Sequence, residues 1–210
     1  MQFSEIERRL RVLPSRLPEA PASLTPVLVD APGVWPRDAG PNAQEAAVLV
    51  LLYPGDDGEA YLVLIERPQG DLRHAGEIGF PGGAIEAGDA SAVEAALREA
   101  REEVGLDPLA VSLHVVGQLA PVDIRASGFR LAPVLALAAR RPDLTADLRE
   151  VAAILEVPLR HFLAGAPIEM VETVRDGWRL RYGAYPVGGH RVWGATARVL
   201  GQLGAILAGG

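Results

Sequence analysis

A helix with both of its ends marked in the sequence interrupts a series of strand-like segments. Ser91 followed by Glu94 has the pattern of a capping box, and Gly105 followed by Pro108 marks a helix end. The predicted helix therefore spans residues 92–104. Runs rich in Val, Leu and Tyr lie at 44–53 and 60–67, and further strand-like runs lie at 111–119, 130–138 and 151–157. Strands interrupted by one capped helix predict an α/β fold with a mixed sheet.

Further secondary structure is predicted at the two ends of the chain. Residues 168–174 and 178–185 are predicted to form a hairpin and 194–207 a final helix, which places the sheet between helices. Residues 4–13 have helical spacing, but the prolines from Pro14 to Pro41 exclude a helix through residue 41. We predict an amino-terminal helix and proline-rich arm at 1–42 and one domain at 43–210. The arm either wraps on the core or is a loose leader.

The composition excludes several classes of function. The chain of 210 residues has 20 basic and 27 acidic side chains and a net charge of −7, which argues against general binding to nucleic acids or anionic membranes. The absence of cysteine excludes disulfides, thiolate zinc sites and a cysteine nucleophile. Charged residues occupy the start of the chain, where a signal peptide needs an apolar core. We therefore expect a cytoplasmic protein.

Three glutamates on the predicted helix have a spacing that suits a divalent cation. Glu99, Glu102 and Glu103 are spaced i, i+3 and i+4, so they project from neighbouring turns, away from the stripe expected to face the sheet. Mg²⁺ prefers oxygen ligands and commonly shares them with substrate phosphates. A solvated helix face is the alternative interpretation. The stripe expected to face the sheet consists of Val93, Leu97, Ala100 and Val104.

The loop before the helix favours the cation site. Its segment Phe80-Pro81-Gly82-Gly83 is a glycine-bearing turn, which lets backbone groups approach a ligand. The sequences GGAIE at 82–86 and REAREEVGL at 98–106 together resemble the Nudix box. Eight residues separate Asp89 from Arg98, where the common box has seven. The longer loop and the segment 67–83 are similar to the coenzyme A pyrophosphatase-like branch, although Pro68 and Leu72 depart from its pattern.

The resemblance, which covers roughly residues 43–207, implies a Nudix α/β/α sandwich and a pyrophosphohydrolase that depends on Mg²⁺ or Mn²⁺. It implies cleavage of the diphosphate of coenzyme A or an acyl derivative to 3′-phosphoadenosine 5′-phosphate and (acyl)phosphopantetheine. The alternatives are a Nudix hydrolase of ADP-ribose, NADH or dinucleoside polyphosphates, and a non-enzymatic nucleotide sensor. A small nucleotide is the expected partner, neither nucleic acid nor membrane is expected to bind, and a homodimer is compatible with the sequence.

The same resemblance assigns roles to individual residues. The implied catalytic residues are Arg98, Glu99, Glu102, Glu103 and Glu150. The implied metal ligands are the Gly83 carbonyl and the carboxylates of Glu99, Glu102 and Glu103. The implied substrate-binding residues are Arg67, Arg73, His74 and Gly82, with Arg73 the candidate for a 3′-phosphate. Arg98 is expected to orient Glu99 or Glu102. Glu150 or Glu86 is the outer ligand or general base, although Glu150 also fits an ordinary charged loop.

Other patterns add little. The histidines at 74, 114, 161 and 190 lack metal-ligand spacing, and the sequence has no serine nucleophile elbow, Walker phosphate loop or dinucleotide fingerprint. Trp35, Trp178 and Trp193 could stack an adenine, although large aromatic residues more often pack in a core.

Overall fold

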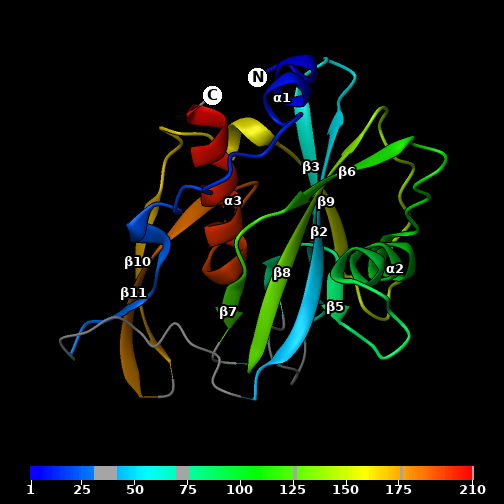
Figure 1. Ribbon diagram of the computed structural model, residues 1–210. Coiled ribbons are helices and arrows are strands. Elements are labelled where there is room, and N and C mark those ends of the chain that lie inside the picture. Colours follow the sequence, from blue (N-terminus) through cyan, green and yellow to red (C-terminus); the bar gives the residue numbers. More distant parts are fainter. Residues whose placement is uncertain (31–41, 70–75, 125–126, 176, 210) are drawn as a thin grey trace.

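The computed structural model describes residues 1–30, 42–69, 76–124, 127–175 and 177–209 (Figure 1). The helices are α1 (Phe3–Arg9), α2 (Ala92–Val104) and α3 (Gly194–Ala208), with short 3-10 helices η1 (Ala22–Leu24) and η2 (Leu159–Phe162). The strands are β1 (Val27–Leu28), β2 (Gln44–Pro54), β3 (Ala60–Glu66), β4 (Ile78–Gly79), β5 (Gly82–Ala84), β6 (Leu113–Gln118), β7 (Val122–Ile124), β8 (Phe129–Ala138), β9 (Ala153–Pro158), β10 (Glu169–Arg175), β11 (Trp178–Val187) and β12 (His190–Val192).

The larger sheet is mixed, as the sequence predicts. Its strand order is β4-β3-β2-β8-β6, with β5 on β2, β7 on β8 and β9 on β3. β2 and β8 run parallel from the pair Gln44 and Phe129 to the pair Leu52 and Leu137. The β2–β3 hairpin is antiparallel, which confirms the predicted hairpin over 44–67.

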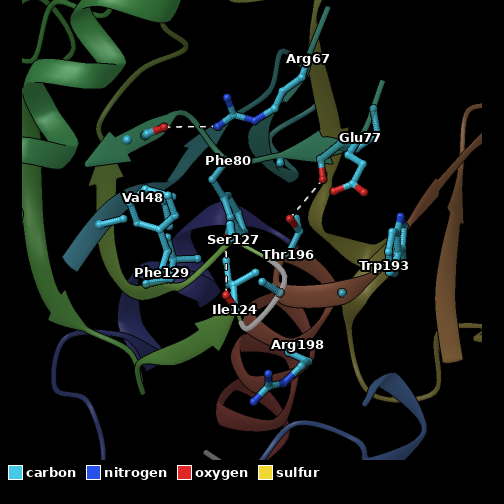
Figure 2. Close-up of a pocket in the computed structure, with 18 of the residues that line it drawn as sticks. Val48, Arg67, Glu77, Phe80, Ile124, Ser127, Phe129, Trp193, Thr196 and Arg198 are labelled. Atoms are coloured by element: carbon cyan, nitrogen blue, oxygen red, sulfur yellow. Dashed lines mark hydrogen bonds between the residues drawn. The ribbon is translucent and has the colours of Figure 1, made fainter. Parts of the chain in front are cut away.

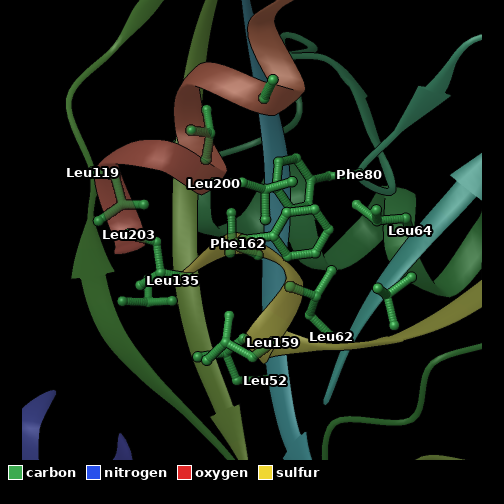
Figure 3. Packing of buried hydrophobic residues seen from close by; sticks show 14 of the residues in the cluster. Leu52, Leu62, Leu64, Phe80, Leu119, Leu135, Leu159, Phe162, Leu200 and Leu203 are labelled. Carbon is green, nitrogen blue, oxygen red and sulfur yellow. The ribbon is translucent and has the colours of Figure 1, made fainter. Parts of the chain in front are cut away.

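Both faces of this sheet are covered. Side chains alternate along β2, so that Ala47, Leu49 and Leu51 pack with α2, whereas Val48 and Val50 pack on the opposite side. The opposite side is closed by α3 and α1, and Figure 3 shows leucines of α3 over those of the sheet. An α/β/α sandwich is therefore confirmed.

A smaller sheet flanks α3. It has the order β1-β11-β10, with β12 on β11, and it contains the predicted hairpin of residues 168–185. Leu180 and Tyr182 of β11 form a small apolar cluster, against which Trp193 packs at the start of α3. This sheet thereby holds the first turn of α3 in place.

Residues 1–30 lie against the core. Ile6 and Leu10 from the region of α1, and Leu24 of η1, are fully buried in the main apolar cluster. β1 adds a strand to β11 through the pair Val27 and Arg181. In the described part of the arm, the chain is wrapped on the core rather than loose. No helix among the described residues is long and apolar enough to span a membrane.

The structure corrects the prediction of which face of α2 is buried. Ala100 and Val104 of the predicted stripe are buried as expected, but Val93 and Leu97 are only partly buried, and Ala95 and Ala96, which were outside the stripe, are fully buried. Alanine lets the helix backbone approach a sheet closely, so the helix is rotated towards its small residues. Glu103 lies about 20° around the helix from Ala96 and is therefore on the buried face, not pointing away from the sheet.

Candidate active site

Local signals fix the ends of α2, and with them the positions of its glutamates. The Ser91 hydroxyl accepts a hydrogen bond from the Glu94 amide at 3.2 Å. The Glu94 carboxylate accepts from the Ala90 amide at 2.7 Å, one residue earlier than in the usual capping box. Gly105 ends the helix in the left-handed conformation, with φ 66°. The predicted bounds of 92–104 are confirmed.

Two glycines allow β5 to pair with β2 and to approach α2 closely. Gly82 has a φ of 152°, and a Cβ atom there would be 2.3 Å from the Ala47 carbonyl oxygen. A Cβ atom on Gly83 would be 2.5 Å from the Glu99 carboxylate. Larger residues at either position would therefore displace β2 or the glutamates. The turn predicted at 80–83 thus brings backbone groups against the carboxylates.

Glu103 is the most buried of the three predicted metal ligands. It is 1 % exposed, and its carboxylate accepts a hydrogen bond from the Gly82 amide at 2.7 Å. Burial raises the pKa of Glu103 to about 7, although the Gly82 amide and Arg67 act in the opposite direction. The nearby charges of Glu99 and Glu150 raise this pKa further.

The other two glutamates are progressively more exposed. The Glu99 side chain is 13 % exposed and the Glu102 side chain 56 %. Burial raises the pKa of Glu99, against the opposing effect of its hydrogen bond from Arg98. The shared helix spacing therefore produces three different environments.

Arg98 connects the helix to the loop before it. Its Nη1 donates to Glu99 at 2.9 Å and to Glu102 at 3.2 Å. This arrangement is compatible with the predicted role of orienting Glu99 or Glu102. Its Nε and Nη2 donate to the two carboxylate oxygens of Asp89, each at 3.0 Å, and Nη2 also donates to the Ala84 carbonyl at 3.1 Å. No role for Asp89 was predicted from the sequence. Its position in the box was the signal that could have indicated this pairing.

The extra residue in the loop does not disturb this pairing. The Asp89 side chain is 5 % exposed and also accepts from the Glu86 amide at 2.8 Å. The Arg98 guanidinium lowers the pKa of Asp89, which keeps this carboxylate ionised.

A cavity of about 520 Å³ opens beside the carboxylates. The predicted site residues that line it are Arg67, Gly82, Gly83, Glu99, Glu103 and Glu150. Arg98, Glu102 and Glu86 are not among the described residues that line it. Glu150 faces the cavity from the loop before β9 and raises the pKa of both buried glutamates. The predicted contacts by Arg73 and His74, and the candidate Trp35, lie outside the described residues.

The remaining walls of the cavity come from segments distant in the sequence (Figure 2). Its apolar lining includes Val48, Phe80, Ile124, Phe129 and Leu131. Its further polar lining includes Glu77, Asp123, Ser127, Trp193, Thr196 and Arg198. Of these, only Trp193 was predicted from the sequence as a candidate ligand contact. Trp178 is 51 % exposed and is not among the described lining residues.

The donor set fits a hard divalent cation bound together with substrate oxygens. Among the described residues, no three acidic or histidine side chains are grouped closely enough to hold a metal ion as they stand. Mg²⁺ typically binds one or two carboxylates together with water and phosphate oxygens, so a complete protein cage is not required. The raised pKa values of Glu99 and Glu103 reflect buried negative charge that a cation would offset.

A mixed sandwich in which a glycine turn meets a glutamate-bearing helix at one cavity is the architecture of a Nudix protein. The family model for the NUDIX domain matches residues 43–156. The chain therefore belongs to the Nudix family.

Relatives with closely similar sequences are described as the uncharacterized Nudix hydrolase NudL. Those from Salmonella newport and Salmonella enteritidis PT4 are each 37 % identical over 171 residues, covering 77 % of this chain and 82 % of theirs. The chain is accordingly a Nudix hydrolase, and so an enzyme.

Two solved structures that resemble this chain are more distant in sequence. The Nudix hydrolase RenU from M. smegmatis is 24 % identical, with a TM-score of 0.47, over 64 % of this chain and 79 % of that one. DR0079 from Deinococcus radiodurans is 16 % identical, with a TM-score of 0.48, over 83 % and 88 % of the two chains.

Proposed function

We propose that this enzyme is a pyrophosphohydrolase that uses Mg²⁺ or Mn²⁺ to cleave the diphosphate of a nucleotide derivative, with coenzyme A or an acyl-coenzyme A as the leading substrate. The observation that carries this proposal is the meeting of Glu99, Glu103 and Glu150 with Arg67 in one cavity. Carboxylates suit a divalent cation, and a guanidinium suits phosphate oxygens.

The first group of residues with a proposed role in this reaction holds the cation. Glu99, Glu102 and Glu103, with the Gly83 carbonyl, would hold the cation, and the exposed Glu102 side chain is able to move towards the other two. A bound cation neutralises diphosphate charge and lowers the pKa of a water molecule. Arg98 holds the orientation of Glu99 through its hydrogen bond.

The substrate and the attacking water are assigned to other groups in the cavity. Glu150 lines the cavity and is our candidate to accept the proton of the attacking water. Arg67 binds a diphosphate oxygen from a position in which it also donates to the Gly82 carbonyl at 3.4 Å. Arg73 and His74 remain proposed phosphate contacts on the resemblance of their segment.

The choice of coenzyme A is supported by the resemblance of segment 67–83 and by the apolar lining of the cavity. Val48, Phe80 and Phe129 offer a surface for an uncharged arm beyond the diphosphate. Hydrolysis of ADP-ribose, NADH or dinucleoside polyphosphates is the second candidate, since these substrates present the same diphosphate to the carboxylates.

A panel of substrates tests the proposal. Coenzyme A, acetyl-coenzyme A, ADP-ribose, NADH and diadenosine tetraphosphate are each incubated with the enzyme and Mg²⁺ or Mn²⁺, and the products are separated by chromatography. We expect coenzyme A to be cleaved to 3′-phosphoadenosine 5′-phosphate with the highest kcat/KM. Preference for another compound would transfer the assignment to that substrate. Binding without cleavage of any of them would indicate a sensor.

A divalent cation is expected to raise the melting temperature. Millimolar Mg²⁺ or Mn²⁺ should add about 4–8 °C at pH 8, because cation binding offsets the repulsion between the buried glutamates. The folded-state pKa of Glu103, about 7, exceeds its ordinary value of 4.5, so metal-free stability falls as pH rises through this window. The benefit of the cation should therefore be larger at pH 8 than at pH 5.5.

Differential scanning fluorimetry with EDTA or added metal measures this shift. Glu103→Gln should lose most of it, whereas Glu94→Gln, on the same helix but not among the described cavity residues, should keep it. Identical melting curves with chelator and with metal would argue against the site.

A further inference from the structure

The cavity has a second cationic end. Figure 2 shows Arg67 at one end and Arg198 at the other, with Phe80, Phe129 and Ile124 between them. Arg67 lies by the Gly82 carbonyl and thus beside the carboxylates. Arg198 belongs to the first turns of α3, on the opposite side of the apolar lining. If the diphosphate is bound at the carboxylates, the part of the substrate that lies near Arg198 is therefore not the diphosphate.

An aromatic platform lies on the same helix terminus. Trp193, the N-cap residue of α3, lines the cavity and stacks on Tyr182, with ring centroids 4.6 Å apart and planes 27° from parallel. Tyr182 is buried in the smaller sheet, so it holds the indole from one face. A ring held in this way loses little conformational freedom when a flat ligand ring stacks on it.

Arg198 brings a positive charge to this end of the cavity. Glu77 and Asp123 also line the cavity, and Arg130 is 3.2 Å from the Asp123 carboxylate and offsets its charge. Thr196, one turn of helix from Trp193, donates its hydroxyl to the Ile78 carbonyl at 3.1 Å, which fixes the start of α3 against β4. Arg198 is thus presented to the cavity from a fixed helix.

We propose that Trp193 and Arg198 form the specificity site for the nucleoside end of the substrate, with the base stacked on Trp193 and a ribose phosphate bound by Arg198. The inference rests on the proposed function, because it requires the diphosphate to lie at Glu99 and Glu103. It assigns selection of a 3′-phosphorylated nucleotide to Arg198, whereas the sequence alone favoured Arg73 for this contact.

The test compares coenzyme A with 3′-dephospho-coenzyme A. Arg198→Met should lower kcat/KM for coenzyme A by ten- to a hundredfold, the range for a lost hydrogen bond to a charged group, and should change that for the dephospho compound less than threefold. Arg198→Lys should retain part of the preference. Arg191→Met, an exposed arginine of β12 that is not among the described lining residues, is the matched control and should behave like the wild type.

Equilibrium binding provides a readout that does not depend on catalysis. Titration calorimetry of the intact protein should show tighter binding of 3′-phosphoadenosine 5′-phosphate than of AMP, a difference that Arg198→Met abolishes. Trp193→Leu should weaken both ligands, and Trp193→Phe should restore part of the affinity. These binding results would support the inference even if the substrate panel showed no hydrolysis of coenzyme A, in which case the proposed function alone would fail.

Other outcomes would overturn the inference. Equal losses on both substrates for Arg198→Met would place Arg198 on the diphosphate. A selective loss for Arg73→Met, with none for Arg198→Met, would return the 3′-phosphate to the residue that the sequence favoured. Melting curves of each variant, with Arg198→Lys as the milder change, separate these results from unfolding.

Discussion

Glu103→Gln is expected to lower kcat by at least 100-fold while the protein remains folded. The substitution removes the charge of a carboxylate that is 1 % exposed and hydrogen-bonded to the Gly82 amide. Glutamine has nearly the same shape and its carbonyl oxygen can still accept from that amide, so the local packing is preserved. Steady-state kinetics at saturating metal measures the effect.

The matched control for this prediction is Glu94→Gln. Glu94 lies on the same helix and caps its start through the Ala90 amide. The Glu94→Gln substitution should lower stability somewhat but leave kcat within about threefold of the wild type, because the Glu94 side chain supplies no charge to the cavity. Near-normal turnover of the Glu103 variant with saturating metal would refute the proposed glutamate site.

Gly82→Ala is expected to destabilise the protein by about 3 kcal/mol or more and to abolish activity. The added Cβ atom would be 2.3 Å from the Ala47 carbonyl oxygen and 2.6 Å from Val48 Cα, so β2 and β5 could not keep their register. The φ of 152° adds backbone strain for any residue with a side chain. Urea denaturation followed by circular dichroism gives the free energy of unfolding.

Two nearby glycines provide control substitutions for Gly82→Ala. Gly88→Ala meets no atom within 4 Å and should change stability little. Gly83→Ala would be 2.5 Å from the Glu99 carboxylate, which can rotate away, so it should lose activity with a smaller loss of stability. If Gly82→Ala and Gly88→Ala proved equally stable, close approach would not be the reason for the glycine at position 82.

The sequence predicted best what local interactions decide. Ser91, Glu94 and Gly105 set the bounds of α2 through their own hydrogen bonds and conformation, and these bounds are confirmed. The burial of Glu103 was predicted wrongly because tertiary packing chose the rotation of the helix. The large apolar residues predicted that the helix would face the sheet through Val93. The smaller alanines are instead more deeply buried against the sheet.

The walls of the cavity could not be predicted from the sequence either. Phe129 and Arg198 come to line the same cavity as the carboxylates only after the sheet and α3 have assembled, and no spacing in the sequence relates them to α2. Glu99 and Glu103 belong to one continuous motif, so the resemblance could indicate them. The other end is built from segments far apart in the sequence, which a motif does not describe.

Arg98 shows how the loop and the helix remain adjusted to one another. Each N–H of its guanidinium has an acceptor, since Nε, Nη1 and Nη2 together donate to Asp89, Glu99, Glu102 and the Ala84 carbonyl. The ammonium of a lysine has three donors around one nitrogen and could not span these acceptors. The contact between the Arg98 guanidinium and the Asp89 carboxylate therefore positions the loop, whatever the number of residues in the loop. A loop of different length can serve the same glutamates, provided that its aspartate still reaches this arginine.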